Sequence, residues 1–240
     1  MNTPKSIPTP LTVTGLNVHN SVGHAIVRAL KRHGVECTFG QSLPTMFQLS
    51  AEAGGIKQIV YRTENAGGYM ADAYARLTGK PGIVTAQNGP AAALLVAPLA
   101  EALKASIPVI ALVQDVSRLQ TDKNAFQDLD HIGMFSAVSK WVRRVNEPSR
   151  VDDYIDQAFT MACSGRPGPV VLLFPSDLLT EPLVPSTRSA CLGQYPLDPT
   201  VASPDAVRHA AELLAKAERP LVIAGGGVHL SHGHAALTRL

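Results

Sequence analysis

The pattern of apolar and polar residues alternates, from position 18 onward, between helical spacing and short β-rich runs. Helices are predicted after Asn20 or Ser21, after Pro44 and after Thr63, and over 91–104 and 151–162. The predicted strands are 36–39, 57–61, 83–86, 109–113, 138–145 and 170–174. Such alternation is typical of an α/β fold. We therefore expect a doubly wound, mainly parallel sheet with helices on both faces over residues 18–180, after an N-terminal tail at 1–17.

The helix after Thr63 contains both large apolar and very small residues. Helical spacing predicts one core-facing stripe, formed by Ala66, Tyr69, Met70, Ala73, Tyr74 and Leu77. Alanine or glycine also occupies positions 66, 67, 68, 71, 73 and 75. We expect these small residues to allow another element or a ligand to pack closely against the helix.

The composition changes after residue 175. Six prolines lie from Pro175 to Pro204, both ends included, which predicts an extended linker over 181–202. Ser203 and Pro204 then form an N-cap and first-turn pair, and 220–227 resembles a buried strand that enters a glycine turn. Because 38 residues from Ser203 onward are close to the lower limit for independent folding, we expect 203–240 to be the truncated start of a second α/β domain.

Composition and charge exclude several classes of protein. With 45% hydrophobic and 17% charged residues, the chain is not expected to be disordered. A net charge of +2 without a basic run argues against nucleic acid and anionic lipid as partners. The N-terminus lacks the apolar core of a signal peptide, so a cytoplasmic location is expected. Three widely spaced cysteines favour reduced, packed thiols over disulfides or a zinc site.

Two segments at the ends of predicted strands carry candidate chemistry. Glu64 falls in the first turn of a helix that follows a strand, where open α/β sheets place ligand sites. A glutamate there is also commonly just a favourable charge on the helix dipole. The turn around Gly89 and Pro90 lies at the end of the next strand, but it lacks a phosphate-loop pattern and Pro90 has no backbone donor, so a phosphate loop is disfavoured.

Six separated motifs occur in an order that resembles one family. They are Phe39-Gly40, the run 62–76 (RTENAGGYMADAYAR), the run 78–82 (TGKPG), Gly89-Pro90, the run 125–127 (AFQ) and the run 165–171 (GRPGPVV). Together they resemble the N-terminal, pyrimidine-binding domain of thiamine-diphosphate-dependent enzymes, and acetolactate synthase most of all. The segment 220–227 is similar to the start of that family's middle domain.

The resemblance implies a function and roles for individual residues. It implies thiamine diphosphate as cofactor, decarboxylation or carboligation of pyruvate-like 2-oxo acids, and either a homodimer or a diphosphate-domain partner. Glu64 would hydrogen-bond N1′ of the aminopyrimidine and help to move its protons, and Gln127 would act beside it. Gly40, Gly89, Pro90 and Phe126 would border the cofactor. Alternatively, Phe126 and Gln127 are loop residues that only pack on the next helix.

The chain also departs from the family pattern. Ser42-Leu43-Pro44 replaces a usual Pro-Gly, an amide expected after Gly89-Pro90 is missing, and Asp128 stands where a glutamate is expected. No segment matches the motif that binds the diphosphate and Mg²⁺, so we expect another domain to hold both and the isolated chain to be inactive. FAD binding has only Gly225-Gly-Gly227 in its favour. The alternative function is a catalytically silent fragment or partner subunit that keeps the fold and its pairing surface.

Histidines at 229, 232 and 234 form the remaining cluster. Their spacing matches no standard set of metal ligands. We expect them to be solvated side chains, and no metal ligand is predicted in this chain.

Overall fold

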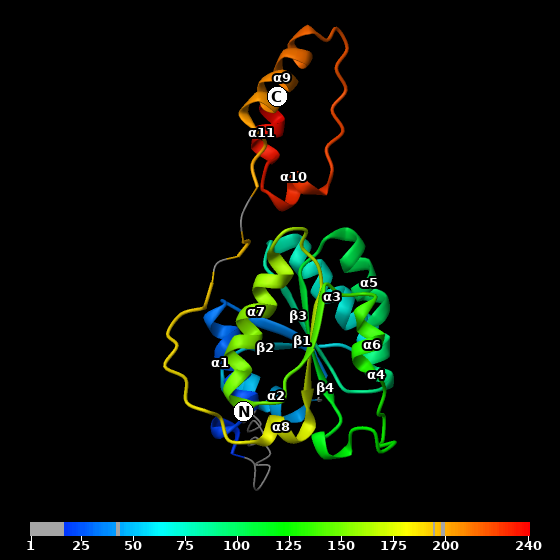
Figure 1. Ribbon diagram of the computed structural model, residues 1–240, viewed down its shortest axis with the longest axis vertical. Helices are drawn as coiled ribbons and strands as arrows, with labels where there is room; N and C mark the ends of the chain where they lie inside the picture. Colours follow the sequence, from blue (N-terminus) through cyan, green and yellow to red (C-terminus); the bar gives the residue numbers. More distant parts are fainter. Residues whose placement is uncertain (1–16, 42–43, 194, 198–199) are drawn as a thin grey trace, which may run out of the picture.

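A six-stranded, all-parallel sheet forms the centre of the protein, in a computed structural model that describes residues 17–41, 44–193, 195–197 and 200–240 (Figure 1). The strand order is β2-β1-β3-β4-β6-β5. The strands are β1 (Cys37–Gly40), β2 (Lys57–Val60), β3 (Gly82–Ala86), β4 (Val109–Asp115), β5 (Trp141–Arg144) and β6 (Val170–Pro175). This confirms the predicted fold class. Except for Asn17, the predicted N-terminal tail lies outside the described residues.

Helices cover both faces of the sheet (Figure 1). One face packs against α1 (Val22–Arg32), α2 (Thr45–Ala53), α7 (Val151–Cys163) and α8 (Ser176–Thr180). The other packs against α3 (Glu64–Thr78), α4 (Pro90–Leu94), α5 (Val96–Ala105) and α6 (His131–Ser136). In the part of the chain that the structure describes, 3₁₀ turns lie before α1, at η1 (Val18–Asn20), and between later elements, at η2 (Arg118–Gln120) and η3 (Pro148–Arg150). In the described ranges, each helix is too short or too polar to cross a bilayer.

Local sequence signals explain where most elements begin and end. The Ser21 hydroxyl accepts a hydrogen bond from the His24 amide at 3.1 Å and so caps α1, while Gly34 adopts a φ of +73° just after that helix. Buried residues make up nearly all of β4, as expected for a parallel strand covered on both faces. The helix predicted over 91–104 is divided at Leu95 into α4 and α5. The strand expected over 138–145 is confined to β5.

The predicted core face of α3 is wrong. Tyr69, Met70 and Leu77 are exposed by 46%, 39% and 86%. Of the six residues predicted to face the core, only Tyr74 packs against it. The buried face is instead the one with small residues, Gly67, Gly68, Ala71, Asp72 and Ala75. The physical reason is close approach of α3 to the sheet and to α5, which leaves no room for long side chains on that face.

Two glycine contacts show how close this approach is. A Cβ on Gly68 of α3 would lie 2.7 Å from Cβ of Pro98 in α5. A Cβ on Gly82 of β3 would lie 2.6 Å from the carbonyl carbon of Ala71 in α3. Real Cβ atoms do not come this close to other heavy atoms. The glycines are therefore required for the position of α3, and with it for the position of Glu64.

The described part of the predicted linker contains neither helix nor strand, and part of it docks on the sheet domain. Arg188 forms ion pairs with Asp153 and Asp156 of α7, and the Leu192 amide donates to the Asp156 carboxylate at 3.1 Å. Tyr195 packs against the core beneath α1 and α7. Arg188, Leu192 and Tyr195 are therefore attached to the domain rather than free of it.

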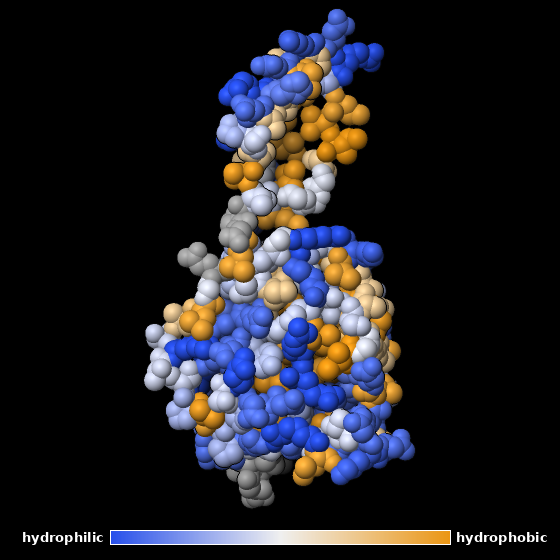
Figure 2. Space-filling model, viewed as in Figure 1, coloured by the Kyte–Doolittle hydropathy of each residue, from blue (hydrophilic) through white to orange (hydrophobic). Residues whose placement is uncertain are grey.

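The C-terminal segment contains α9 (Pro204–Lys216), α10 (Gly226–Leu230) and α11 (His234–Arg239). The Ser203 hydroxyl caps α9 as predicted, accepting from the Ala206 amide at 3.1 Å. The buried strand expected over 220–227 is wrong: 221–225 is irregular, and Leu221 and Ile223 are 84% and 88% exposed. Figure 2 shows this apolar surface between α9 and α10. An apolar run becomes a buried strand only where neighbouring strands pair with it, and no described strand does so here.

Candidate functional site

The carboxyl ends of the strands form the edge of the sheet where the predicted site residues lie. From β1 the chain moves outward to β2 and then crosses back to β3, so β1 and β3 are neighbours that lead in opposite directions. Ligands of open α/β sheets bind at this kind of reversal. Gly40 ends β1, and the turn with Gly89 and Pro90 follows β3. Glu64 follows β2 at the same edge.

Glu64 is the first residue of α3 and is half-buried. Its neighbour Tyr61 donates a hydrogen bond to the Thr85 carbonyl at 2.5 Å. Burial raises the pKa of Tyr61, and the charge of Glu64 raises it further, so the phenol stays neutral. The Glu64 carboxylate lies at the positive end of the α3 dipole, which favours a negative charge there. This position fits both the functional and the helix-dipole interpretation.

The turn after β3 and the loop after β4 are in direct contact. The Asn88 side-chain amide donates to the carbonyl of Gln127 at 3.2 Å and lies 3.4 Å from that of Phe126. Gly89 has a φ of +66°, and a Cβ there would lie 2.5 Å from Cβ of Gln127. Gln127 itself has a φ of +61°, which is uncommon outside glycine. The structure thus brings Gly89 and Gln127 together and leaves Phe126 82% exposed.

The backbone donor of Gly89 points into the protein. It donates to Nε2 of His131 at 2.8 Å, and Pro90 has no N–H. These two positions therefore offer no backbone donor to a phosphate. What the turn presents to a ligand is its shape and the residues that it holds in place.

Sequence reasoning missed a buried polar group behind this turn. His131 at the start of α6 and Asp115 at the end of β4 are both fully buried and lie 3.0 Å apart, Nδ1 to Oδ1. Nη2 of Arg144, at the end of β5, lies 2.6 Å from Oδ2 of Asp115. The available signal was an acidic residue two positions after the wholly apolar run 109–113, since a buried carboxylate needs partners.

Not every predicted residue is joined to the others. Among the described residues, no hydrogen bond or ion pair connects Glu64 to Gly40, Gly89 or Gln127. Gly40 is held from another side, because a Cβ there would meet the side chains of Gln48 and Thr85. These two side chains hydrogen-bond each other at 2.8 Å. Glu64 and Gln127 therefore belong to the same edge of the sheet but to separate contact groups.

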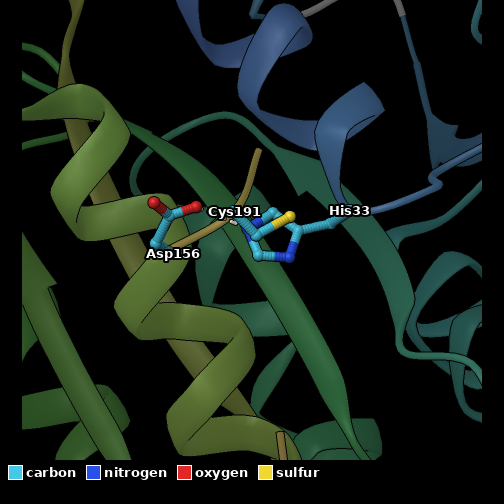
Figure 3. Close-up of side chains that lie close together, drawn as sticks. All are labelled: His33, Asp156 and Cys191. Atoms are coloured by element: carbon cyan, nitrogen blue, oxygen red, sulfur yellow. Dashed lines mark hydrogen bonds and ion pairs between the residues drawn. The ribbon is translucent and has the colours of Figure 1, made fainter. Parts of the chain in front are cut away.

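A second cluster lies away from this edge. His33 follows directly on α1, Asp156 lies in α7 and Cys191 lies in the linker. Their nitrogen, oxygen and sulfur atoms lie within 4.8 Å of one another (Figure 3). Nε2 of His33 donates to Asp156 at 2.6 Å, and the Cys191 thiol donates to the Arg32 carbonyl at 3.1 Å. Positions so far apart in the chain gave no signal for this cluster.

The side chains of this second cluster that could bind a metal ion already have other partners. Arg188 contacts the Asp156 carboxylate at 3.1 Å, and Arg32 lies 4.0 Å from it. Burial raises the pKa of the Cys191 thiol, which keeps it protonated. A carboxylate already paired with arginine and a protonated thiol are poor metal ligands. The cluster is better explained as the fastening of the linker to the sheet domain.

The histidines near the C-terminus contact each other and α3. Nε2 of His229 lies 2.7 Å from the carbonyl oxygen of Arg76, and its Nδ1 lies 3.2 Å from Nε2 of His234. His229, His232 and His234 are all exposed. They are therefore solvent-accessible side chains in the described structure.

Comparisons with known proteins agree with this picture. The family described as "Thiamine pyrophosphate enzyme, N-terminal TPP binding domain" matches residues 20–134. The chain is 34% identical over 227 residues to an acetolactate synthase of Arthrospira platensis, covering 90% of this chain and 39% of that protein. It is 35% identical over 217 residues to the acetolactate synthase isozyme 2 large subunit of Escherichia coli K12, covering 88% of this chain and 38% of that one.

A plant relative extends the range of the similarity. The chloroplastic acetolactate synthase of Arabidopsis thaliana is 31% identical over 207 residues, which cover 84% of this chain and 31% of that protein. The chain thus spans less than two fifths of the length of these relatives. The matched residues 20–134 contain Gly40, Glu64, Gly89 and Gln127. From these matches and the fold, the chain belongs to the thiamine-diphosphate-dependent enzymes, in which it corresponds to the N-terminal, pyrimidine-binding part of the acetolactate-synthase-like members.

Proposed function

We propose that this chain binds the aminopyrimidine of thiamine diphosphate through Glu64 and acts within an acetolactate-synthase-like enzyme that decarboxylates and joins 2-oxo acids. The observation that carries the proposal is the position of Glu64. It heads a helix at the carboxyl edge of the sheet, inside the range that matches the TPP-binding family. The relatives' names supply the reaction class, since those proteins are acetolactate synthases.

The residues at this edge fit an aminopyrimidine, which presents both hydrogen-bond donors and acceptors. Glu64 carries a half-buried carboxyl group at the head of α3. Oε1 of Gln127 is buried and has no hydrogen-bond partner among the described residues. A carboxyl group that can accept or donate a hydrogen bond and an amide oxygen that can accept a hydrogen bond are complementary to such a ring. Buried polar atoms without partners call for an explanation, and a ligand supplies one.

The chain's own residues would contribute binding, orientation and proton movement. When bound, thiamine diphosphate supplies the carbon centre that carries the 2-oxo acid and accepts the electrons released by decarboxylation. Glu64 would hydrogen-bond N1′ and exchange a proton with it through its carboxyl oxygen. Gln127 would orient the ring or the substrate, and Phe126 would shield them from water. Gly40, Gly89 and Pro90 would border the ring.

Other parts of the enzyme would hold the diphosphate. We propose that Mg²⁺ is bound together with the diphosphate by residues outside this chain and that the chain alone does not turn over substrate. Binding of FAD and a cytoplasmic location stay predictions from the sequence.

We also propose that a partner covers the outer face of α3 and α6, as a second copy in a homodimer or as the protein that brings the diphosphate domain. Tyr69 and Met70 on α3, Leu94 at the end of α4 and Ile132 on α6 are each exposed by 39–46%. In Figure 2, apolar surface is visible on the side where Figure 1 places α4, α5 and α6. Apolar surface of this kind is a mark of association when several such residues lie together.

Calorimetric titration tests the proposal. Thiamine diphosphate with Mg²⁺ is titrated into the chain alone and into the chain mixed with a protein that supplies a diphosphate-binding domain. We expect tight binding only in the mixture. Glu52→Gln on the exposed surface of α2 is the matched control, and it should leave binding unchanged. No binding in the mixture would favour the catalytically silent fragment, and pyruvate turnover by the chain alone would contradict the need for a partner.

A further inference from the structure

The tautomer of His131 is fixed by its two partners. The Gly89 amide can only donate, so Nε2 of His131, 2.8 Å away, must be the unprotonated acceptor. Nδ1 then carries the proton and donates it to Oδ1 of Asp115 at 3.0 Å. Both side chains are completely buried. Water therefore cannot replace either bond.

Asp115 is held in its charged form. Burial raises the pKa of its carboxyl group, but the hydrogen bond from His131 and the charge of Arg144 outweigh that effect and leave the pKa below its usual range. The Val116 amide adds a hydrogen bond to Oδ1 at 2.9 Å. A carboxylate can only accept hydrogen bonds, so Asp115 requires the proton on Nδ1 of His131. The carboxylate of Asp115, paired with Arg144, thus keeps the proton of the His131 ring on Nδ1 and leaves Nε2, which faces Gly89, free to accept.

The same turn holds Gln127 through independent contacts. The Asn88 amide donates to the Gln127 carbonyl at 3.2 Å, and Asn88 is only 5% exposed. The missing Cβ of Gly89 lets the Gln127 backbone approach, since a Cβ there would lie 3.0 Å from the Gln127 carbonyl oxygen. His131 therefore anchors a turn against which Gln127 is packed.

We propose that His131 is a positioning residue: held by Asp115 as the Nδ1–H tautomer, it fixes the turn at 88–90 and through it the place of Gln127. The role of Gln127 toward a ligand rests on the proposed function, but the link between Asp115, His131 and Gly89 does not. Without the His131 acceptor, the Gly89 amide would be a buried donor with no partner and the turn would shift to satisfy it.

Nuclear magnetic resonance on the ¹⁵N-labelled 240-residue chain tests the link without any cofactor. We expect a nitrogen–nitrogen coupling across the hydrogen bond from Gly89 to Nε2 of His131, and a slowly exchanging proton on Nδ1. A His131 ring that carries its proton on Nε2 would overturn the proposal. This measurement needs no variant, so it remains decisive even if a substitution prevents folding.

Variants then test the positioning role. His131→Phe should speed hydrogen exchange at the Gly89 and Gln127 amides by roughly tenfold or more, the effect of losing one buried hydrogen bond. His131→Gln, whose Oε1 can stand near the position of Nε2, should recover part of that protection. His33→Phe removes a buried, hydrogen-bonded histidine on the other face of the sheet and should leave both amides unchanged. Equal effects of the two phenylalanine variants would contradict a specific role for His131.

The two proposals fail in different ways. If the coupling is present but thiamine diphosphate does not bind in the mixture described above, the cofactor proposal fails and the link stands. If the cofactor binds but His131 has the opposite tautomer, the link fails and the cofactor proposal stands.

Discussion

Replacing Gly82 by alanine tests whether close packing of α3 on the sheet is required. The new Cβ would lie 2.6 Å from the carbonyl carbon and 2.9 Å from Cα of Ala71, and closer still to the Ala71 oxygen. These are backbone atoms of a helix, so no side chain can rotate away and α3 or β3 has to move. Overpacking of this kind costs about 1–3 kcal/mol, and a backbone clash belongs at the upper end.

The alanine also restricts the unfolded chain, which returns about 0.5–1 kcal/mol. The net loss should therefore be about 2 kcal/mol, or a Tm lower by roughly 4–8 °C for a domain of this size. Thermal unfolding followed by circular dichroism measures it. Gly225→Ala is the matched control, because no atom lies within 4 Å of a Cβ there and its φ of −91° suits any residue. A Gly82→Ala protein with an unchanged Tm would refute the argument that α3 must pack closely against the sheet.

Three further predictions concern chemistry, pH and the linker. In a chain completed by a diphosphate domain, Glu64→Gln should slow exchange of the cofactor's C2 proton, measured by NMR, on the order of 10²- to 10⁴-fold; exchange at the parental rate would leave Glu64 as a helix-dipole residue. Burial lowers the pKa of His33 from 6.5, and the hydrogen bond to Asp156 offsets this only in part, so the unfolded chain takes up protons first. Urea unfolding should therefore show stability falling as the pH drops below about 7, with a smaller slope in His33→Gln, and identical slopes would exclude His33 as the cause. A chain ending at Thr187 should melt lower than one ending at Val201, because it lacks the linker contacts to Asp156; equal melting temperatures would mean that docking adds no stability.

The strands and the sheet edge were predictable because their signals are local. Apolar runs such as β4, and the glycines at the end of β1 and after β3, are visible in the sequence, and they place Gly40, Glu64 and Gly89 at one edge. The orientation of α3 was not predictable, because Met70 is as apolar as any core residue. What excludes it from the core is the distance between helix and sheet, which depends on Gly82 in another element.

Contacts between residues far apart in the chain could not be predicted from the sequence, because they too depend on how separate elements pack. The bond from Gly89 to His131 joins residues 42 positions apart, and the one from His33 to Asp156 joins residues 123 positions apart. No periodicity or local motif encodes such a pair. The error at 220–227 is of the same kind, since an apolar run is compatible with a strand but does not supply the strands that must pair with it.

One face of α3 is needed for folding and the other is exposed to the proposed assembly, although these two requirements usually overlap in a protein. Enlarging Gly68 would disturb the folded domain itself, through its contact with Pro98. Making Tyr69 or Met70 polar removes nothing from the core, so the domain should fold as before while any assembly across that surface weakens. Successive positions along one helix therefore allow folding and the proposed association to be altered independently, and a scan of substitutions through α3 would separate the positions needed for folding from those needed for association.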